Sequence, residues 1–491
     1  MVKRLTDKMF YKYLRCPHWV YWDIYGKGSD AAESSELLRK IREHEVLEHG
    51  EFLGSFGKVE TVPGEGDEEE HFARTLELMK AGSAAIFRGR LIDGMWIGAP
   101  DLLRRAKTPN GTVSKLGDWL YEPYLIKNIL VGEEKDIRDE FRFELAFYAL
   151  ILEKLQGVRP DTGYVIAADK TVHGVKINSV LEDFHLTLRE IENIVNGKKP
   201  APFLSSSCKE SPWFGSCVRE AEASDDICLI YKIRRTDHAK LYAAGIKTIA
   251  ELAHTDLDTL ETAVPEMSRR KLEMLRRQAI ALRDRRMVVI QQPSFAPAPE
   301  YYFDIEGDPL RNLHYLFGLL RVASPKAKGI YSYSLAKNPA DEKEAWLGFL
   351  ELVKKAPAGA PFYHYGTYEK IVVALFAEKY GGDRKTIEKL EKGLTNLLPT
   401  VCESVALPVY FYSLKDIVKE MGFTWRHKEA SGVNSIVWYE DYLRQKASGK
   451  KRDALKAKKI LQDIVDYNED DVRATLFLKR RLEHLPEPES V

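Results

Sequence analysis

The sequence predicts a multidomain α/β protein. Its 491 residues are too many for one hydrophobic core, so two or three domains are expected. A composition of 44% apolar and 30% charged residues is typical of an ordinary globular chain. Segments with strand alternation and segments with helical periodicity occur on both sides of a proline-rich stretch, residues 291–299. This stretch is typical of a semi-rigid linker and marks the clearest domain boundary.

Net charge and hydropathy limit the partners and the cellular location that the sequence predicts. Lys and Arg together number 74, as do Asp and Glu, so any binding of nucleic acid must come from local patches. No run of about 18 apolar residues occurs, so no membrane span is expected. Residues 1–8 lack the apolar core of a signal peptide, which predicts a cytoplasmic protein.

The first domain is predicted to cover residues 1–230 and carries several polar residues on expected helices and strands. In chain order they are His44 on a charged helix, Asp101 on a strand with a Gly-Pro break, Lys127 at the end of a partner strand, and Glu144 and Tyr148 on an apolar helix. This order resembles the RecB-type PD-(D/E)XK nucleases. The resemblance implies a restriction-endonuclease-like α/β core, in which two acids hold a metal and a lysine polarises the attacked phosphate or activates water.

The acids of this first domain depart from the RecB pattern. The acid that normally lies two residues before the lysine falls on Leu125. Two replacements are open: Glu122, which by strand alternation faces the opposite side from Leu125, and Glu144, which stands where glutamine is usual. The resemblance therefore implies that Asp101 is a metal ligand and that Lys127 is part of the site. That site is either an active nuclease or a worn centre that only binds nucleic acid.

Four of the five cysteines follow a related pattern. In the iron–sulfur subgroup of RecB-type nucleases, one cysteine precedes the nuclease core and three follow it with the spacing Cys-x-x-Cys-x5-Cys. Here Cys16 precedes the core, Cys208 and Cys217 follow it, and the middle position is Ser211, a poor cluster ligand because iron prefers thiolate. With Cys228 as the fourth ligand, the resemblance implies a [4Fe–4S] cluster that clasps the two ends of the domain. A zinc site and ordinary buried thiols are the alternatives.

Residues 231–288 are predicted to form a small helical domain, followed by the linker at residues 289–298. Within it, residues 238–252 resemble a helix-hairpin-helix module with Gly245 at the tight turn. Such hairpins present backbone N–H groups to a phosphate. A basic run at residues 268–277 adds to this interpretation, although a solvated helix surface has the same pattern.

The last domain, residues 299–491, begins with a strand whose alternate residues point to opposite faces. Asp304 and Glu306 share one face at the end of this apolar strand, and Gly307 then interrupts the pattern. Two like charges so close together repel each other, and a divalent metal relieves that cost. Oxygen ligands suit magnesium or manganese. A solvated strand end with two chance acids is the alternative interpretation.

Two later segments supply further candidates. Residues 463–478 have helical periodicity, which places Tyr467 and Asp471 one turn apart on one face. A phenol beside a metal-bound carboxylate orients or deprotonates an attacking water. Between this helix and the first strand, an aromatic strand turns into a helix at Glu369. His364 in that strand is interpreted as a packed, hydrogen-bonded residue.

These three motifs, in this order, resemble the DEDD-type exonucleases of the RNase H-like superfamily, in the DnaQ group with tyrosine in the last motif. The resemblance covers roughly residues 299–485. It implies an RNase H-like α/β domain in which four acids hold two metals and a tyrosine aligns the water for 3′→5′ removal of nucleotides. The four acids are Asp304, Glu306, Glu369 and Asp471, and the tyrosine is Tyr467. The second motif normally supplies aspartate, and the longer Glu369 changes metal spacing or affinity.

The complete order resembles a family of predicted RecB-type nucleases of bacteria and archaea that carry a C-terminal RNase H-like domain. The first hypothesis is a metal-dependent 3′→5′ exonuclease acting on single-stranded DNA or RNA through the C-terminal domain, with DNA favoured over RNA. The second is a RecB-like nuclease acting through Asp101, Lys127 and either Glu122 or Glu144. The third is a nucleic-acid-binding scaffold with two decayed sites. The basic segment at residues 425–428 is a further candidate for contact with phosphate.

Overall fold

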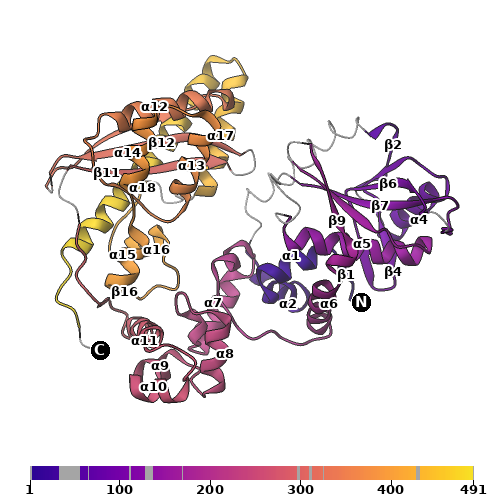
Figure 1. The fold of residues 1–491 in the computed structure, drawn as a ribbon, viewed down its shortest axis with the longest axis horizontal. Helices are drawn as coiled ribbons and strands as arrows, with labels where there is room; N and C mark the ends of the chain where they lie inside the picture. The colour runs from indigo at the N-terminus through magenta and orange to yellow at the C-terminus, as the bar shows by residue number, and fades with distance from the viewer. Residues whose placement is uncertain are drawn as a thin grey trace. The chain divides into compact units, whose positions relative to one another are not determined.

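The computed structural model divides the chain into two compact units, Met1–Glu220 and Ala221–Val491 (Figure 1). It describes residues 3–32, 56–64, 66–109, 112–127, 137–167, 170–295, 299–308, 312–324, 326–426 and 432–489. His44, predicted as a site residue, lies outside the described residues. No helix in the described ranges is long and apolar enough to cross a membrane.

The first unit is built around a mixed sheet with the described strand order β2-β3-β6-β7-β8-β9. Its central strand β7 pairs antiparallel with β6 and parallel with β8. A smaller sheet has the order β1-β5-β4. The bounds are β1 Leu5–Thr6, β2 Val59–Thr61, β3 Ala85–Phe87, β4 Leu91–Asp93, β5 Trp96–Gly98, β6 Leu102–Lys107, β7 Trp119–Ile126, β8 Thr162–Ile166 and β9 Val172–Lys176.

An apolar helix, α5 (Asp139–Gln156), fills the core of the first unit, as its composition predicts. Phe143, Phe147 and Ile151 on this helix are buried in one cluster with Leu125 of β7. A left-handed Gly157 ends the helix. The other described α-helices are α1 Lys8–Arg15, α2 Pro17–Tyr25, α4 Glu68–Lys80, α6 Leu181–Val195 and α7 Phe214–Ala223, which crosses into the second unit.

The helical segment predicted as a separate domain belongs to the second compact unit. Its last strand, β10 (Val288–Val289), pairs antiparallel with β16 (Val405–Ala406) of the C-terminal region. Gln278 donates to the Tyr412 hydroxyl at 3.0 Å. These contacts tie the segment to residues more than a hundred positions later, within the unit that begins at Ala221. The helices are α8 Arg235–Ala243, α9 Ile249–His254, α10 Leu257–Ala263 and α11 Arg269–Asp284.

The C-terminal region contains a mixed sheet with the described order β13-β12-β11-β14-β15. β11, β12 and β13 pair antiparallel, whereas β14 and β15 extend the sheet in parallel with β11. The strand that carries Asp304 and Glu306 therefore lies in the middle. The bounds are β11 Glu300–Asp308, β12 Leu313–Val322, β13 Ile330–Leu335, β14 Phe362–His364 and β15 Leu394–Asn396.

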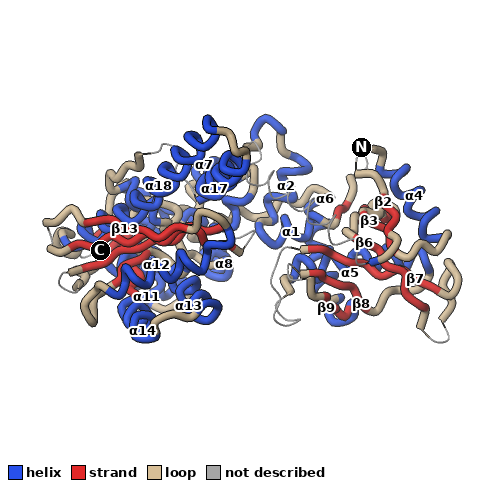
Figure 2. Tube along the Cα trace, turned by 90° about the horizontal axis from the view of Figure 1, so that it is seen from above, coloured by secondary structure: helices blue, strands red, loops and turns tan. Residues whose placement is uncertain are grey.

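Helices pack on both faces of this sheet (Figure 2). Phe303 lies in a core cluster with Trp346 of α12 and Phe376 of α13. Tyr302, its neighbour on β11, lies in the opposite cluster with Val472 of α18. Strand alternation therefore directs Asp304 and Glu306 toward α18. The helices are α12 Glu342–Lys354, α13 Tyr368–Tyr380, α14 Arg384–Gly393, α15 Leu397–Ser404, α16 Leu414–Glu420, α17 Gly432–Ala447 and α18 Lys451–Glu483.

Candidate active site

Three carboxylates meet where α18 passes the end of β11. Asp304 and Glu306 come from the strand and Asp471 from the helix, and their ligand atoms all lie within 4.8 Å of one another. Within the described part of the chain, no other set of three or more His, Cys, Asp or Glu side chains meets this distance. We call these three residues the carboxylate group. Directly after Glu306, a bulge between Glu306 and Gly307 shifts the register in which β11 pairs with β12.

Burial and mutual repulsion raise the pKa values of the carboxylate group. For Asp304 the largest cause is burial, followed by the charges of Glu306 and Asp471. Burial, and then the charge of Asp471, raise the pKa of Glu306 from 4.5 to about 7. Burial likewise raises the pKa of Asp471. Closely spaced oxygen donors that resist holding their negative charges fit a hard divalent cation, which would favour the ionised forms.

Glu369, the predicted fourth acid, is not a member of the carboxylate group. It is buried at the start of α13, and its Oε2 lies 3.3 Å from Nδ1 of the buried His364. Its charge contributes to the raised pKa of Asp304, so it lies nearby. The structure thus brings together three of the four predicted acids and pairs the fourth with a histidine. The interpretation of His364 as a packed, hydrogen-bonded residue agrees with this geometry.

Tyr467 lies beside the carboxylate group, one helical turn before Asp471. Its buried hydroxyl hydrogen-bonds to Asp471 and accepts a hydrogen bond from Lys415 Nζ at 2.6 Å. Burial, followed by the charges of the three carboxylates, raises its pKa. The phenol therefore keeps its proton at neutral pH. This favours the orienting role predicted for Tyr467 over proton abstraction from water.

Asn468 and Gly318 support the site and were not identified from the sequence. Asn468 Nδ2 donates to Asp304 Oδ2 at 2.8 Å, and the Tyr331 hydroxyl donates to Asn468 Oδ1 at 2.8 Å. Gly318 pairs with Asp304 across β11 and β12, and a Cβ there would lie 1.8 Å from Asn468 Oδ1. A glycine inside a strand often marks such a close approach, so Gly318 was the available signal.

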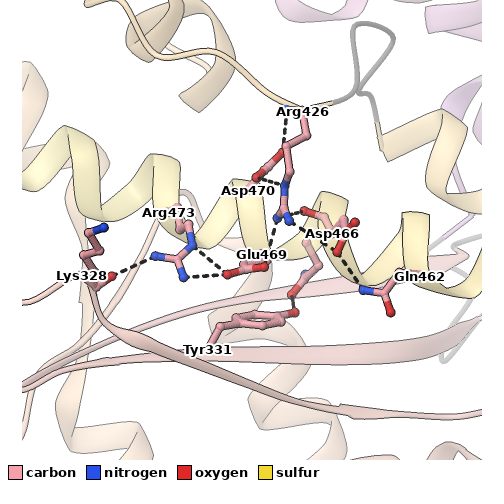
Figure 3. Close-up of polar contacts among 9 residues, drawn as sticks. Lys328, Tyr331, Arg426, Gln462, Asp466, Glu469, Asp470 and Arg473 are labelled. Atoms are coloured by element: carbon pink, nitrogen blue, oxygen red, sulfur yellow. Dashed lines mark hydrogen bonds and ion pairs between the residues drawn. The ribbon is translucent and has the colours of Figure 1, made fainter.

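Trp425 and Arg426, which follow α16 in the chain, are both held by side chains of α18. Trp425 Nε1 donates to Asp471 Oδ1 at 2.6 Å. Figure 3 shows the Arg426 guanidinium directed onto the acids of α18, with its Nε 2.8 Å from Asp470 Oδ1 and an NH2 group 3.1 Å from Glu469. Acids of the same unit thus hold the Arg426 guanidinium, and its contact with phosphate stays a prediction. Residues 427 and 428 lie outside the described ranges.

Comparison with known proteins agrees with this geometry. A family profile described as RNase_H superfamily matches residues 301–483, which contain the carboxylate group and Tyr467. This match assigns a fold to the C-terminal part of the chain. Residues 301–483 form an RNase H-like domain. A search of curated proteins finds no match. The RNase H-like domain supports a nuclease-type function, the hydrolysis of phosphodiester bonds in a nucleic acid.

The predicted residues of the first unit form a different arrangement from those of the RNase H-like domain. Lys127 Nζ lies 3.8 Å from Asp101 Oδ2 and 3.8 Å from Glu144 Oε2. Lys8 Nζ lies 3.9 Å from the same Glu144 oxygen. Burial raises the pKa of Glu144 despite the opposing charges of Lys127 and Lys8. We call Asp101, Lys127 and Glu144 the N-terminal cluster.

Glu122 does not join the N-terminal cluster. Burial raises the pKa of Glu122, against the opposing charges of Arg104 on the adjacent β6 and Lys176 on β9, two strands away. Of the two candidate replacement acids, only Glu144 lies beside Lys127. Tyr148, one turn after Glu144, donates instead to Asp7, a buried acid at the start of α1 that sequence analysis did not identify.

Three of the four predicted cluster cysteines lie close together in the first unit. The Cys16 thiol hydrogen-bonds to Cys208, and the charges of Cys208 and Cys217 also contribute to its raised pKa. The Ser211 hydroxyl accepts from Trp213 N at 3.1 Å. Cys228 lies in the second unit, where its backbone N donates to Asp226 at 2.7 Å. The RecB-like, iron–sulfur and helix-hairpin-helix resemblances stay predictions.

Proposed function

We propose that the RNase H-like domain is a metal-dependent 3′→5′ exonuclease of single-stranded DNA or RNA, with DNA favoured. The observation that carries this proposal is the carboxylate group, with Tyr467 hydrogen-bonded to Asp471 at its edge. The carboxylate group would hold magnesium or manganese, with Glu369 as an additional acid close by. When bound, such an ion stabilises the charge that develops on the phosphate and favours an activated water.

The remaining residues position these groups. Asn468 donates to Asp304 and Trp425 donates to Asp471, and each bond holds one carboxylate oxygen in a fixed direction. The Tyr467 hydroxyl donates its proton to Asp471, and its oxygen can orient the attacking water by accepting a hydrogen bond from it.

The test is hydrolysis of oligonucleotides labelled at the 3′ or the 5′ end, as DNA and as RNA, with magnesium or manganese. The isosteric Asp304→Asn is expected to reduce the rate by a factor on the order of 10³ or more, because it removes a charged ligand from the carboxylate group. Asp101→Asn and the exposed control Asp258→Asn are expected to retain activity. Full activity of Asp304→Asn would contradict the proposal.

A RecB-like nuclease in the first unit is the second candidate, favoured by the position of Lys127 beside Asp101 and Glu144. The same assay separates the two, because this candidate requires an inactive Asp101→Asn and an active Asp304→Asn. Binding without cleavage in every metal would instead support the scaffold hypothesis.

A [4Fe–4S] cluster in the first unit is proposed from the family resemblance and supported by the proximity of Cys16, Cys208 and Cys217. Anaerobically purified protein is then expected to absorb light at about 400 nm. The Cys208→Ser variant is expected to lose this absorbance. Colourless protein with stoichiometric zinc would favour the zinc alternative.

A further inference from the structure

Lys415 brings a positive charge to the carboxylate group from a separate helix. It is the second residue of α16, whose start is fixed by Ser413, because the Ser413 hydroxyl accepts from Asp416 N at 3.2 Å. Ile417 and Val418 anchor this short helix in the core. The position of the Lys415 backbone is therefore set by capping and packing.

The ammonium group of Lys415 lies between two aromatic rings and the acids. Nζ donates to the Tyr467 hydroxyl at 2.6 Å and lies 4.6 Å from the centre of that ring. It lies 5.8 Å from the centre of the Trp425 ring. Its charge acts on all three acids of the carboxylate group, lowering the pKa of each against the effect of burial. The side chain is only partly buried, so solvent reaches it.

We propose that Lys415 binds the phosphate that is to be cleaved. This inference rests on the proposed nuclease function. A phosphate approaching the carboxylate group meets like charge, and a lysine ammonium is a compact cation that offsets it. Because solvent reaches this side chain and its Nζ already lies at the edge of the carboxylate group, its positive charge can attract a non-bridging phosphate oxygen there.

The experiment compares Lys415→Met with Lys419→Met, which removes an exposed lysine one turn later on the same helix. Binding of a fluorescent single-stranded oligonucleotide is measured in EDTA over a range of salt concentrations. Binding of manganese alone is measured by calorimetry. Lys415→Met is expected to bind the oligonucleotide about tenfold more weakly, with a salt slope smaller by about one. Its manganese affinity should be equal or higher, because a repelling cation is removed. Lys419→Met should match the wild type.

Three results would overturn this inference. The first is unchanged oligonucleotide affinity and salt slope in Lys415→Met. The second is parallel loss of manganese and oligonucleotide binding with a lower melting temperature, which indicates a structural role. The third is a wild-type protein that binds no oligonucleotide. Since both measurements are made without turnover, an absence of hydrolysis would contradict the proposed function and leave this test intact.

Discussion

The carboxylate group and the N-terminal cluster are both largely buried acidic sites, but their charges are balanced differently. In the carboxylate group three acids lie within 4.8 Å of one another, and the charge of Lys415, whose Nζ donates to Tyr467, acts on all three. In the N-terminal cluster Lys127 lies 3.8 Å from both acids. The first arrangement has three acids for the single charge of Lys415 and requires an added cation to be stable in its ionised form, whereas in the second Lys127 lies beside both acids.

The largest effect that tests this difference is expected for Glu306→Gln in the absence of metal. The pKa of Glu306 is raised from 4.5 to about 7, so the folded protein binds its proton more tightly than the unfolded chain. The wild type should therefore lose stability relative to Glu306→Gln as the pH rises from 4.5 to about 7, by about 3 kcal/mol in total. Urea unfolding in EDTA at several pH values measures this change.

Manganese provides the internal control for that experiment, because an ion held by the carboxylate group should restore the stability of the wild type at neutral pH. Glu420→Gln, which changes an exposed acid of α16, should show no pH-dependent difference from the wild type. A difference between wild type and Glu306→Gln that stays constant with pH would remove the electrostatic basis of the comparison.

Removing the cation of the N-terminal cluster is expected to change stability by a smaller amount and to lower it, whereas Glu306→Gln raises it at neutral pH. Lys127→Met should destabilise the first unit by about 2 kcal/mol at neutral pH, because it leaves the buried Glu144 without its nearer, mostly buried cation. Since the pKa of Glu144 is raised, the loss should shrink as the pH falls and this acid becomes protonated. Urea unfolding of the variant at neutral and acidic pH measures both effects.

Lys8→Met is the matched control, because Lys8 lies 3.9 Å from the same Glu144 oxygen but is 54% exposed. It should cost less than about 1 kcal/mol, as expected for an exposed ion pair. Equal losses in the two lysine variants, or a stabilised Lys127→Met, would show that the N-terminal cluster does not contain a compensating cation.

Local pattern was sufficient for part of the candidate site. Strand alternation predicted that Asp304 and Glu306 share a face, and helical periodicity predicted that Tyr467 and Asp471 lie one turn apart. Both features depend only on the geometry of one element. Glu369 was harder, because its pairing with His364 depends on how a strand end and a helix start meet. The ion pairs of Arg426 could not be predicted for a similar reason, since an exposed basic loop and a loop held by distant acids have the same sequence pattern.

The sequence by itself determined the α/β class, the strand and helix that carry the carboxylate group, and the face on which each acid lies, because these follow from repeat periods within short segments. Only the tertiary structure decided which elements meet. In the folded chain Asn468 donates to Asp304, which lies 164 positions earlier, and Gly318 has no side chain to block that contact. Lys415 lies beside Tyr467. Such contacts depend on packing between whole faces of the sheet and its helices, which no short segment encodes on its own.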